Sequence, residues 1–272
     1  MTSPLPKVIG RLKRLRVVRK CRDAVLHSGW MLDLCHKAYQ ERARSIVASR
    51  YLRGEGLEIG AAFSPLDVPR GVKVRYVDHK SREELAREYR DVAHKLVDVD
   101  LIDRSGTLSD VPDESVDFII ANHVIEHTTD PIHAIAQWLR VVKEGGVVFM
   151  CVPDKRFTFD SQRSVTSLEH LVRDHTEGPA VSSTSDAEDY LRHVCQVPAD
   201  VLAVRAQAVI EQALECHFHV WTTSDFLELL VYCRRNLSFP FQIEFCHQHG
   251  MEAMLVLRKL SGESDPVGGL DA

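Results

Sequence analysis

Alternating strand-like and helix-like segments between Leu57 and Pro153 constrain the fold of this chain more than any other feature. Short apolar segments typical of strands recur along this stretch, and longer amphipathic segments separate several of them. This alternation predicts a parallel sheet whose strands are joined by right-handed crossovers. We expect strands at 57–59, 74–77, 96–99, 116–121 and 147–152, and helices at 81–89 and 131–142.

Two of the expected strands carry a carboxylate near their ends. Glu58 and Gly60 lie at the end of the first strand, and Asp78 ends the second. The carboxyl ends of parallel strands form the ligand-binding edge of such a sheet. Glycine lets the backbone approach a ligand, and a carboxylate at the second strand can accept hydrogen bonds from a ribose diol. This pattern predicts a site for a nucleoside-containing cofactor; a buried strand and turn without a ligand is the alternative.

The regular alternation ends after Pro153 and resumes only near the end of the chain. We expect a helix at 223–233, a hairpin of strands at 241–246 and 251–257, and a mobile loop at 182–185. Gly145 and Gly146 are expected to end one helix and begin the next strand. The expected organisation is a basic helical extension (1–50), a cofactor-binding core (51–153), a substrate-side insertion (154–216), a segment completing the core (217–260) and a disordered tail (261–272).

The composition is that of an ordinary globular protein, with 272 residues, 44% hydrophobic residues and a net charge of −5. No apolar segment reaches the roughly twenty residues of a membrane span, and the seven cysteines lack Cys-x-x-Cys spacing. We therefore expect reduced thiols and a cytoplasmic location. Residues 7–22 are rich in Lys and Arg, which allows peripheral membrane or protein contact, or a solvated helix. We expect no nucleic-acid partner.

The order of several motifs resembles that of class I S-adenosylmethionine-dependent methyltransferases. The motifs are Leu57–Gly60, Tyr76–Asp78, Asp113–Asp117, Glu126–His127, Arg140–Gly146 and the strand ending at Pro153. The resemblance covers residues 52–156 and, more loosely, 217–258. It implies a Rossmann-like, mostly parallel seven-stranded sheet with helices on both faces and an antiparallel terminal strand. It also implies S-adenosylmethionine as cofactor and S-adenosylhomocysteine as product.

The resemblance implies a set of cofactor-binding residues along the strand ends. They are Glu58, Gly60, Ala61, Phe63, Asp78, His79, Asp103, Leu108, Asn122 and His123. The first loop departs from the family pattern, because Ala61 and Ala62 stand where further glycines are common. Since alanine disfavours positive φ, we expect this loop to follow a different path.

Three further segments, 153–160, 169–171 and 217–221, resemble methyltransferase-like proteins of sugar and polysaccharide assembly. This resemblance implies a small, polar, sugar-containing acceptor, and the available histidine bases favour O-methylation. Acidic residues next to aromatic rings suit a polyol. The expected substrate residues are Asp154, Lys155, Arg156, Phe157, Phe159, Asp160, His170 and His219.

His123, His127 and Asp154 are the candidate catalytic residues. The two histidines follow the fourth core strand, close to the expected methyl group, and imidazole is the side chain best suited to accept a proton near neutral pH. His127 could instead orient the turn. His217 and His219 share one strand face and could contribute to a metal site, or bond to core backbone groups; we expect no metal.

Two other functions remain open from the sequence. The cofactor site could serve a binding or scaffold role in a glycan-assembly complex, docked through the basic segment. A different reaction at the same cofactor site, in glycan or natural-product assembly, is the other alternative. The sequence indicates neither the acceptor atom nor the oligomeric state.

Overall fold

The computed structural model describes residues 29–104 and 106–261. The chain divides into two units, Met1–Arg44 and Ser45–Ala272, which are treated separately. Helix α2 (Gly29–Tyr51) runs from the first unit into the second, in agreement with the helix expected up to residue 50. The basic segment 7–22 and tail residues 262–272 lie outside the described residues. None of the helices in the described ranges combines the length and apolar character needed to span a membrane.

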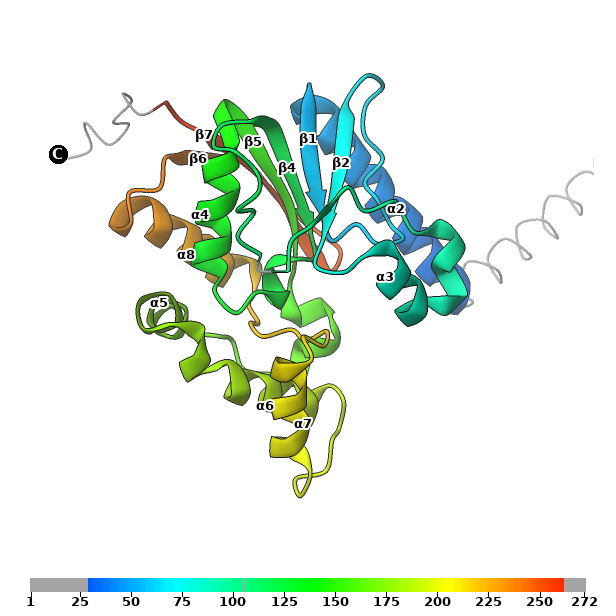
Figure 1. The fold of residues 1–272 in the computed structure, drawn as a ribbon, viewed down its shortest axis with the longest axis vertical. Helices are drawn as coiled ribbons and strands as arrows, with labels where there is room; N and C mark the ends of the chain where they lie inside the picture. Colours follow the sequence, from blue (N-terminus) through cyan, green and yellow to red (C-terminus); the bar gives the residue numbers. More distant parts are fainter. Residues whose placement is uncertain (1–28, 105, 262–272) are drawn as a thin grey trace, which may run out of the picture. The chain divides into compact units, whose positions relative to one another are not determined.

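The second unit contains the seven-stranded sheet that the sequence predicts (Figure 1). Its strand order is β3-β2-β1-β4-β5-β7-β6. The strands from β3 to β5 are parallel to their neighbours, whereas β7 is antiparallel to both β5 and β6. The strands are β1 (Glu55–Ile59), β2 (Lys73–Asp78), β3 (Leu101–Ile102), β4 (Val116–Asn122), β5 (Val142–Pro153), β6 (Phe241–His249) and β7 (Glu252–Lys259).

Side chains at the helix starts explain where the core helices begin. Helix α3 (Arg82–Glu88) begins with a capping box between Ser81 and Glu84, and α8 (Thr223–Asn236) begins with one between Thr222 and Asp225. Helix α4 (Pro131–Val141) has a proline in its first turn, where the missing N–H costs nothing. These helices confirm the sequence expectations to within three residues at each end.

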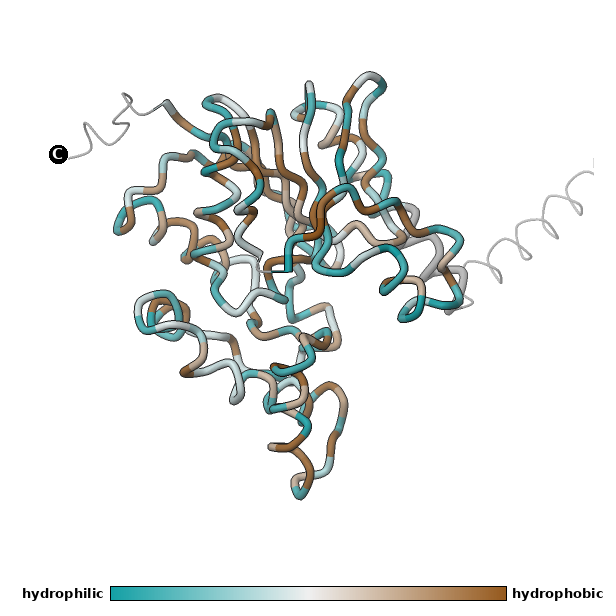
Figure 2. Tube along the Cα trace, in the orientation of Figure 1, coloured by the Kyte–Doolittle hydropathy of each residue, from teal (hydrophilic) through white to brown (hydrophobic). Residues whose placement is uncertain are grey.

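The main hydrophobic core lies between one face of the sheet and helices α4 and α8. Ile119 and Met150 from the sheet are buried there with Trp138 of α4 and Phe226 of α8. Figure 2 shows the hydrophobic residues running along the central strands. On the other face, residues such as Phe118 are also fully buried. A Cβ on Gly56 would lie 2.4 Å from Phe118, so only glycine fits this close contact.

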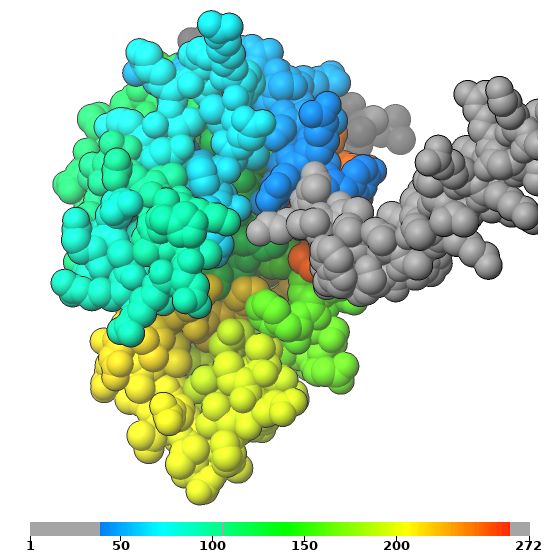
Figure 3. Space-filling model, turned by 90° about the vertical axis from the view of Figure 1, so that its right-hand side faces the viewer, coloured from blue at the N-terminus to red at the C-terminus, as the bar shows by residue number. Residues whose placement is uncertain are grey.

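Helices follow β5 instead of further strands. These elements are η3 (Lys155–Phe157), η4 (Phe159–Gln162), α5 (Leu168–Glu177), η5 (Pro179–Val181), α6 (Ser183–His193) and α7 (Leu202–Glu211). Helices α6 and α7 lie side by side (Figures 1 and 3). They have a small core of their own. That core consists of Ala187, Leu191, Leu202, Ala206, Val209, Cys216 and Phe218. We call residues 154–222 the insertion region.

The prediction of a strand at 96–99 is wrong. The third strand is instead Leu101–Ile102, five residues further along from the expected start. The chain before it forms a 3-10 helix, η1 (Arg90–Lys95), and the N–H of Val97 bonds to the carbonyl of Ala62. Because this backbone group bonds to a loop, the apolar segment that resembled a strand has no ladder partner here.

Two other expectations need correction. Residues 182–185 form the start of α6 and not a mobile loop, because Ser182 is buried and donates to Asp174. Gly145 and Gly146 do not separate α4 from β5, since Val142 already pairs with Val116. The glycines lie within β5, where a Cβ on Gly146 would come 2.6 Å from the carbonyl oxygen of Asp117.

Candidate active site

The end of β1 is shaped by a buried carboxylate and a glycine with positive φ. The Glu58 carboxylate accepts a hydrogen bond of 2.9 Å from the N–H of Leu66, which draws the loop after β1 back over the strand end. Gly60 has φ +66°, and a Cβ there would lie 3.3 Å from Val124. A side chain at this position would therefore be both strained and crowded.

The loop after Gly60 contains a strained alanine. Ala62 has φ +44°, so the expectation that this loop avoids positive φ is wrong at Ala62. A left-handed conformation costs a non-glycine residue about 1–2 kcal/mol. The Ala62 carbonyl accepts a 3.0 Å hydrogen bond from the N–H of Val97, which helps to hold it in place. Next to it, the Phe63 ring packs edge-on against Tyr89, with ring centroids 5.3 Å apart.

Asp78 lies at the end of β2 with its side chain only 7% exposed. Its Oδ1 accepts a 3.1 Å hydrogen bond from the N–H of Lys80 and lies 3.1 Å from Nδ1 of His79. Among the residues described, none donates to Oδ2. One oxygen of this carboxylate therefore remains available to accept from hydroxyl groups.

Asp103 lies beside Asp78, and Leu108 is hydrogen-bonded to Asp103. The N–H of Asp103 donates to the carbonyl of Asp78 at 2.9 Å. The Asp103 carboxylate accepts from the N–H groups of Gly106 at 3.1 Å and Leu108 at 2.8 Å. These bonds close a turn that holds Leu108 at φ +51° with 2% of its surface exposed.

Asn122 and His123 form the end of β4. The Oδ1 atom of Asn122 is buried and has no hydrogen-bond partner among the described residues. His123 has φ +54°, and its N–H donates to the carbonyl of Cys151 at 2.8 Å. A buried, unsatisfied amide oxygen is costly unless a ligand or water bonds to it.

His123 is an ion-paired imidazole. Its Nε2 lies 2.7 Å from Glu252, and its Nδ1 lies 3.4 Å from Glu126. Both carboxylates are fully buried. Burial alone would lower the pKa of His123, but the interactions with Glu126 and Glu252 raise it to about 9. His123 is therefore an imidazolium at neutral pH, with both ring nitrogens facing carboxylates.

His127 and His217 have their Nδ1 atoms fixed by acceptors. The Nδ1 of His127 lies 2.9 Å from the Cys216 carbonyl, and that of His217 lies 2.7 Å from Asp160. Because a carbonyl only accepts, Nδ1 of His127 carries the hydrogen and Nε2 carries the lone pair of the neutral ring. Burial lowers the pKa of His127, which favours the neutral ring. The two rings meet edge to face, with centroids 4.6 Å apart.

Glu126 connects this imidazole pair to the end of β4. One potential ligand atom from each of Glu126, His127 and His217 lies within 4.8 Å of the others. Glu126 also faces His123, as described above. The end of the central strand and the imidazole pair therefore adjoin the same buried carboxylate.

Aromatic rings lie next to His217. Phe159 has its ring centroid 4.8 Å from that of His217, and the Tyr190 centroid lies at 6.0 Å. Phe159 is 56% exposed. Arg163 is buried and bonds to Asp160 at 2.9 Å, which fixes the carboxylate that holds His217.

Asp154 is fully engaged in structural hydrogen bonds. It accepts from the backbone and guanidinium of Arg156 and from the backbone and hydroxyl of Thr223 at the start of α8. Burial opposes its ionisation, but these bonds outweigh burial and lower its pKa to about 2. The geometry gives no support to a catalytic role for Asp154. Arg156 lies over the ring of Phe157, and Lys155 donates to the carbonyl of Ser161.

His170 and His219 lie apart from the imidazole pair, in a cluster with Asp174 and Asp186. His219 is 1% exposed, so its side chain is not presented to a substrate. The sequence interpretation missed several residues of these networks: Arg163, Asp174, Asp186, Tyr190 and Glu252. It named Glu126 in a motif but gave it no role in the site. The spacing of His170 and Asp174, one helical turn apart, is the only local signal that could have indicated the cluster.

The strand ends suit S-adenosylmethionine. Asp78 offers an acceptor for ribose hydroxyls, Asn122 offers an unsatisfied amide oxygen, and the positive φ values of Gly60 and Ala62 turn the backbone sharply at β1. An unpaired positive charge among these groups would repel the sulfonium, and no described residue places one there. The residues present therefore fit the cofactor that the sequence resemblance implies.

Several solved structures match the chain at low sequence identity and with TM-scores below 0.5. A protein from Rhodobacter sphaeroides described as a zinc-dependent alcohol dehydrogenase is 17% identical, with a TM-score of 0.49, covering 81% of this chain and 90% of its own. S-adenosylmethionine-dependent methyltransferases from Methanosarcina mazei (16% identity, TM-score 0.42, 78% and 95% covered) and Thermotoga maritima (16%, 0.44, 90% and 96%) also match. At these values we draw no functional conclusion from them. No curated protein sequence matched the chain.

The sequence itself matches a family model described as a methyltransferase domain over residues 27–209. This range covers more than half of the chain and includes β1 to β5, the strand ends described above, helices α5 and α6, and most of α7. The chain therefore belongs to this methyltransferase family, and its cofactor is S-adenosylmethionine.

Proposed function

We propose that this enzyme transfers a methyl group to a hydroxyl of a small, polar, sugar-containing acceptor, with His127 as the proton acceptor. The observation that carries the proposal is the fixed tautomer of His127, whose Nδ1 donates to the Cys216 carbonyl. Its Nε2 is thereby free to accept a proton from the acceptor hydroxyl. S-adenosylmethionine supplies an electrophilic methyl group on a sulfonium.

His123 has a different role in this proposal. Because its pKa is raised to about 9, it is already protonated at neutral pH and cannot act as a base. We assign it to positioning, since it joins the buried carboxylates Glu126 and Glu252 at the end of β4. Asp154 is assigned to anchoring α8.

The residues around the imidazole pair support a sugar-containing acceptor. The exposed rings of Phe157 and Phe159 lie in a segment with Arg156 before them and Asp160 after them, an arrangement that suits a polyol with one apolar face. His217, fixed by Asp160, offers a further nitrogen for a second hydroxyl. Holding the hydroxyl and methyl group in line supplies much of the acceleration in such a displacement.

A product analysis tests this proposal. The protein is incubated with S-adenosylmethionine carrying a ¹³C-methyl group and with panels of sugar nucleotides, glycosides, amines and carboxylic acids. We expect a methylated sugar product whose ¹³C shift is that of an O-methyl group, formed by wild type and not by His127→Gln. Methyl transfer only to nitrogen, carbon or carboxylate acceptors would overturn the proposed acceptor.

A further inference from the structure

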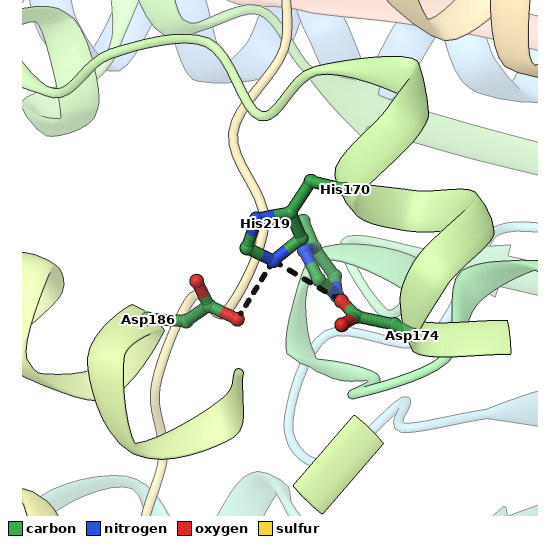
Figure 4. Close-up of side chains that lie close together, drawn as sticks. All are labelled: His170, Asp174, Asp186 and His219. Atoms are coloured by element: carbon green, nitrogen blue, oxygen red, sulfur yellow. Dashed lines mark hydrogen bonds and ion pairs between the residues drawn. The ribbon is translucent and has the colours of Figure 1, made fainter. Parts of the chain in front are cut away.

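Four metal-ligating side chains converge inside the insertion region (Figure 4). His170 and Asp174 come from α5, Asp186 from α6, and His219 from the extended segment before α8. One potential ligand atom from each lies within 4.8 Å of all the others. None of the four belongs to the strand-end site or to the imidazole pair.

The spacing of these atoms matches the ligand shell of a small metal ion. Nε2 of His170 lies 3.1 Å from Asp174 and 3.2 Å from Asp186, and Nε2 of His219 lies 3.9 Å from Asp174. In a tetrahedral zinc site with bonds of about 2.0–2.1 Å, ligand atoms lie about 3.3–3.4 Å apart. The two His170 separations differ from this value by about 0.2 Å and the His219 separation by about 0.5 Å, differences that side-chain rotation can supply.

Two buried polar atoms of the cluster have no hydrogen-bond partner among the described residues. Asp174 is fully buried, and its Oδ2 receives no well-aligned hydrogen bond despite its distance from His170. Nδ1 of His219 is also buried without a partner among the described residues. Charged carboxylates are costly to bury, and a cation between Asp174 and Asp186 would offset that cost.

The surroundings hold several ligands in place. The hydroxyl of Ser182 donates to Oδ1 of Asp174, which leaves Oδ2 directed at the cluster. The His219 ring stacks on Trp221, with centroids 6.3 Å apart and planes at 22°. Two contacts oppose metal binding: Nε2 of His219 lies 3.4 Å from the carbonyl oxygen of Thr129, and the exposed side chain of Arg173 faces Nδ1 of His170 at 3.4 Å. This exposed side chain has to move when Nε2 binds a metal and Nδ1 carries the hydrogen.

We propose that His170, Asp174, Asp186 and His219 bind a zinc ion that fastens α5, α6 and the segment before α8 to one another. Two imidazoles and two carboxylates suit zinc, and four protein ligands complete a tetrahedral shell without an open position for substrate. The role is therefore structural. The α6–α7 core is small, and small cores commonly need a metal or another cross-link for stability.

The same four side chains also form a hydrogen-bonded network without metal, with His170 between two aspartates. The zinc-bound and metal-free states differ in the number of zinc ions per chain and in thermal stability, so experiments can distinguish them. The group of Glu126, His127 and His217 offers three ligands and is separate from this cluster, since two of its members follow β4. Variants in each group therefore show which of the two groups binds the metal.

The test uses the full-length protein, purified without chelator and analysed for metal by mass spectrometry. The metal is then removed with a chelator, and zinc is titrated back while binding heat and thermal unfolding are followed. We expect one zinc per chain and a melting temperature several degrees higher with zinc than without it. Cobalt replacing zinc should give the strong visible absorption of a tetrahedral site.

Variants complete the test. His219→Gln and Asp174→Asn should lose the zinc, the cobalt spectrum and the zinc-dependent rise in melting temperature. His193→Gln on α6, whose side chain is 40% exposed and outside the cluster, should retain all three. Circular dichroism identifies variants that fail to fold. Where a variant fails to fold, the cobalt spectrum of the conservative variant Asp186→Glu is compared with that of wild type instead. Wild type without bound metal or zinc response, or metal lost only in His127→Gln, would overturn the assignment.

Discussion

The strand-end edge and the insertion region differ in how each is built. At the strand ends, backbone geometry dominates: Gly60, Ala62 and His123 all have positive φ, and each carboxylate is fixed by N–H groups close to it in sequence. In the insertion region, side chains separated by tens of residues hold one another, as Asp160 holds His217. The first arrangement suits a constant cofactor, whereas the second can change with the acceptor.

If this comparison is correct, a change at the strand ends and a change at the imidazole pair, which contacts the insertion region through Cys216 and His217, should have separate effects. His127→Gln should reduce kcat by about 10²–10⁴-fold, because a positioned base contributes that much to proton transfer. Its affinity for S-adenosylhomocysteine should stay unchanged. Steady-state kinetics and calorimetry check the two quantities. The exposed variant His94→Gln serves as control, and an equal loss in cofactor affinity would contradict the separation.

The complementary change is Asp78→Asn at the strand ends. We expect S-adenosylhomocysteine to bind about 10–100-fold more weakly, because hydrogen bonds to a charged group contribute about 1.5–3 kcal/mol. The kcat at saturating cofactor should fall much less. Calorimetric titration measures the affinity, with exposed Asp110→Asn as the matched control. Unchanged affinity in Asp78→Asn would remove this residue from the cofactor site.

His123 links the two regions, and its protonation should stabilise the fold. Its pKa rises from 6.5 to about 9 on folding, so its contribution is complete below about pH 6.5 and is lost as pH rises through 9. With a third of the side chain exposed, screening limits this contribution to about 1–3 kcal/mol. Urea unfolding at pH 6.5 and pH 9 should show a larger loss for wild type than for His123→Gln. Equal losses would show that the ion pairs do not stabilise the fold.

The smallest expected effect concerns the strained alanine of the first loop. Ala62→Gly should increase the free energy of unfolding by about 0.5–1 kcal/mol, because relief of the positive φ exceeds the entropy that glycine loses. Ala61→Gly is the control, because Ala61 does not have positive φ. This substitution should lower the free energy of unfolding by a similar amount. Chemical denaturation measures both. Destabilisation by Ala62→Gly would show that the loop is unstrained.

The same comparison explains what the sequence could predict. Glu58, Gly60 and Asp78 are local signals, since each stands at the end of an apolar strand, and the structure places all three at one edge of the sheet. The prediction of a strand at 96–99 failed because the N–H of Val97 donates to the carbonyl of Ala62, in a loop about thirty-five residues earlier in the chain. Such a partner leaves no trace in local periodicity.

The insertion region was less predictable for the same reason. His127 was a candidate from its position after β4, but its tautomer depends on the Cys216 carbonyl, 89 residues further along. Asp174 and Asp186 become neighbours only when α5 and α6 pack. Buried charges of this kind resemble ordinary surface charges in the sequence.

Hydrogen exchange with and without S-adenosylhomocysteine tests most directly whether the cofactor binds at the strand ends. Peptides spanning 57–66, 76–81 and 101–111 should become protected on binding, while those spanning 168–177, 183–193 and 202–211 should exchange at unchanged rates. Unchanged exchange in the first group, or protection confined to the second, would contradict the account.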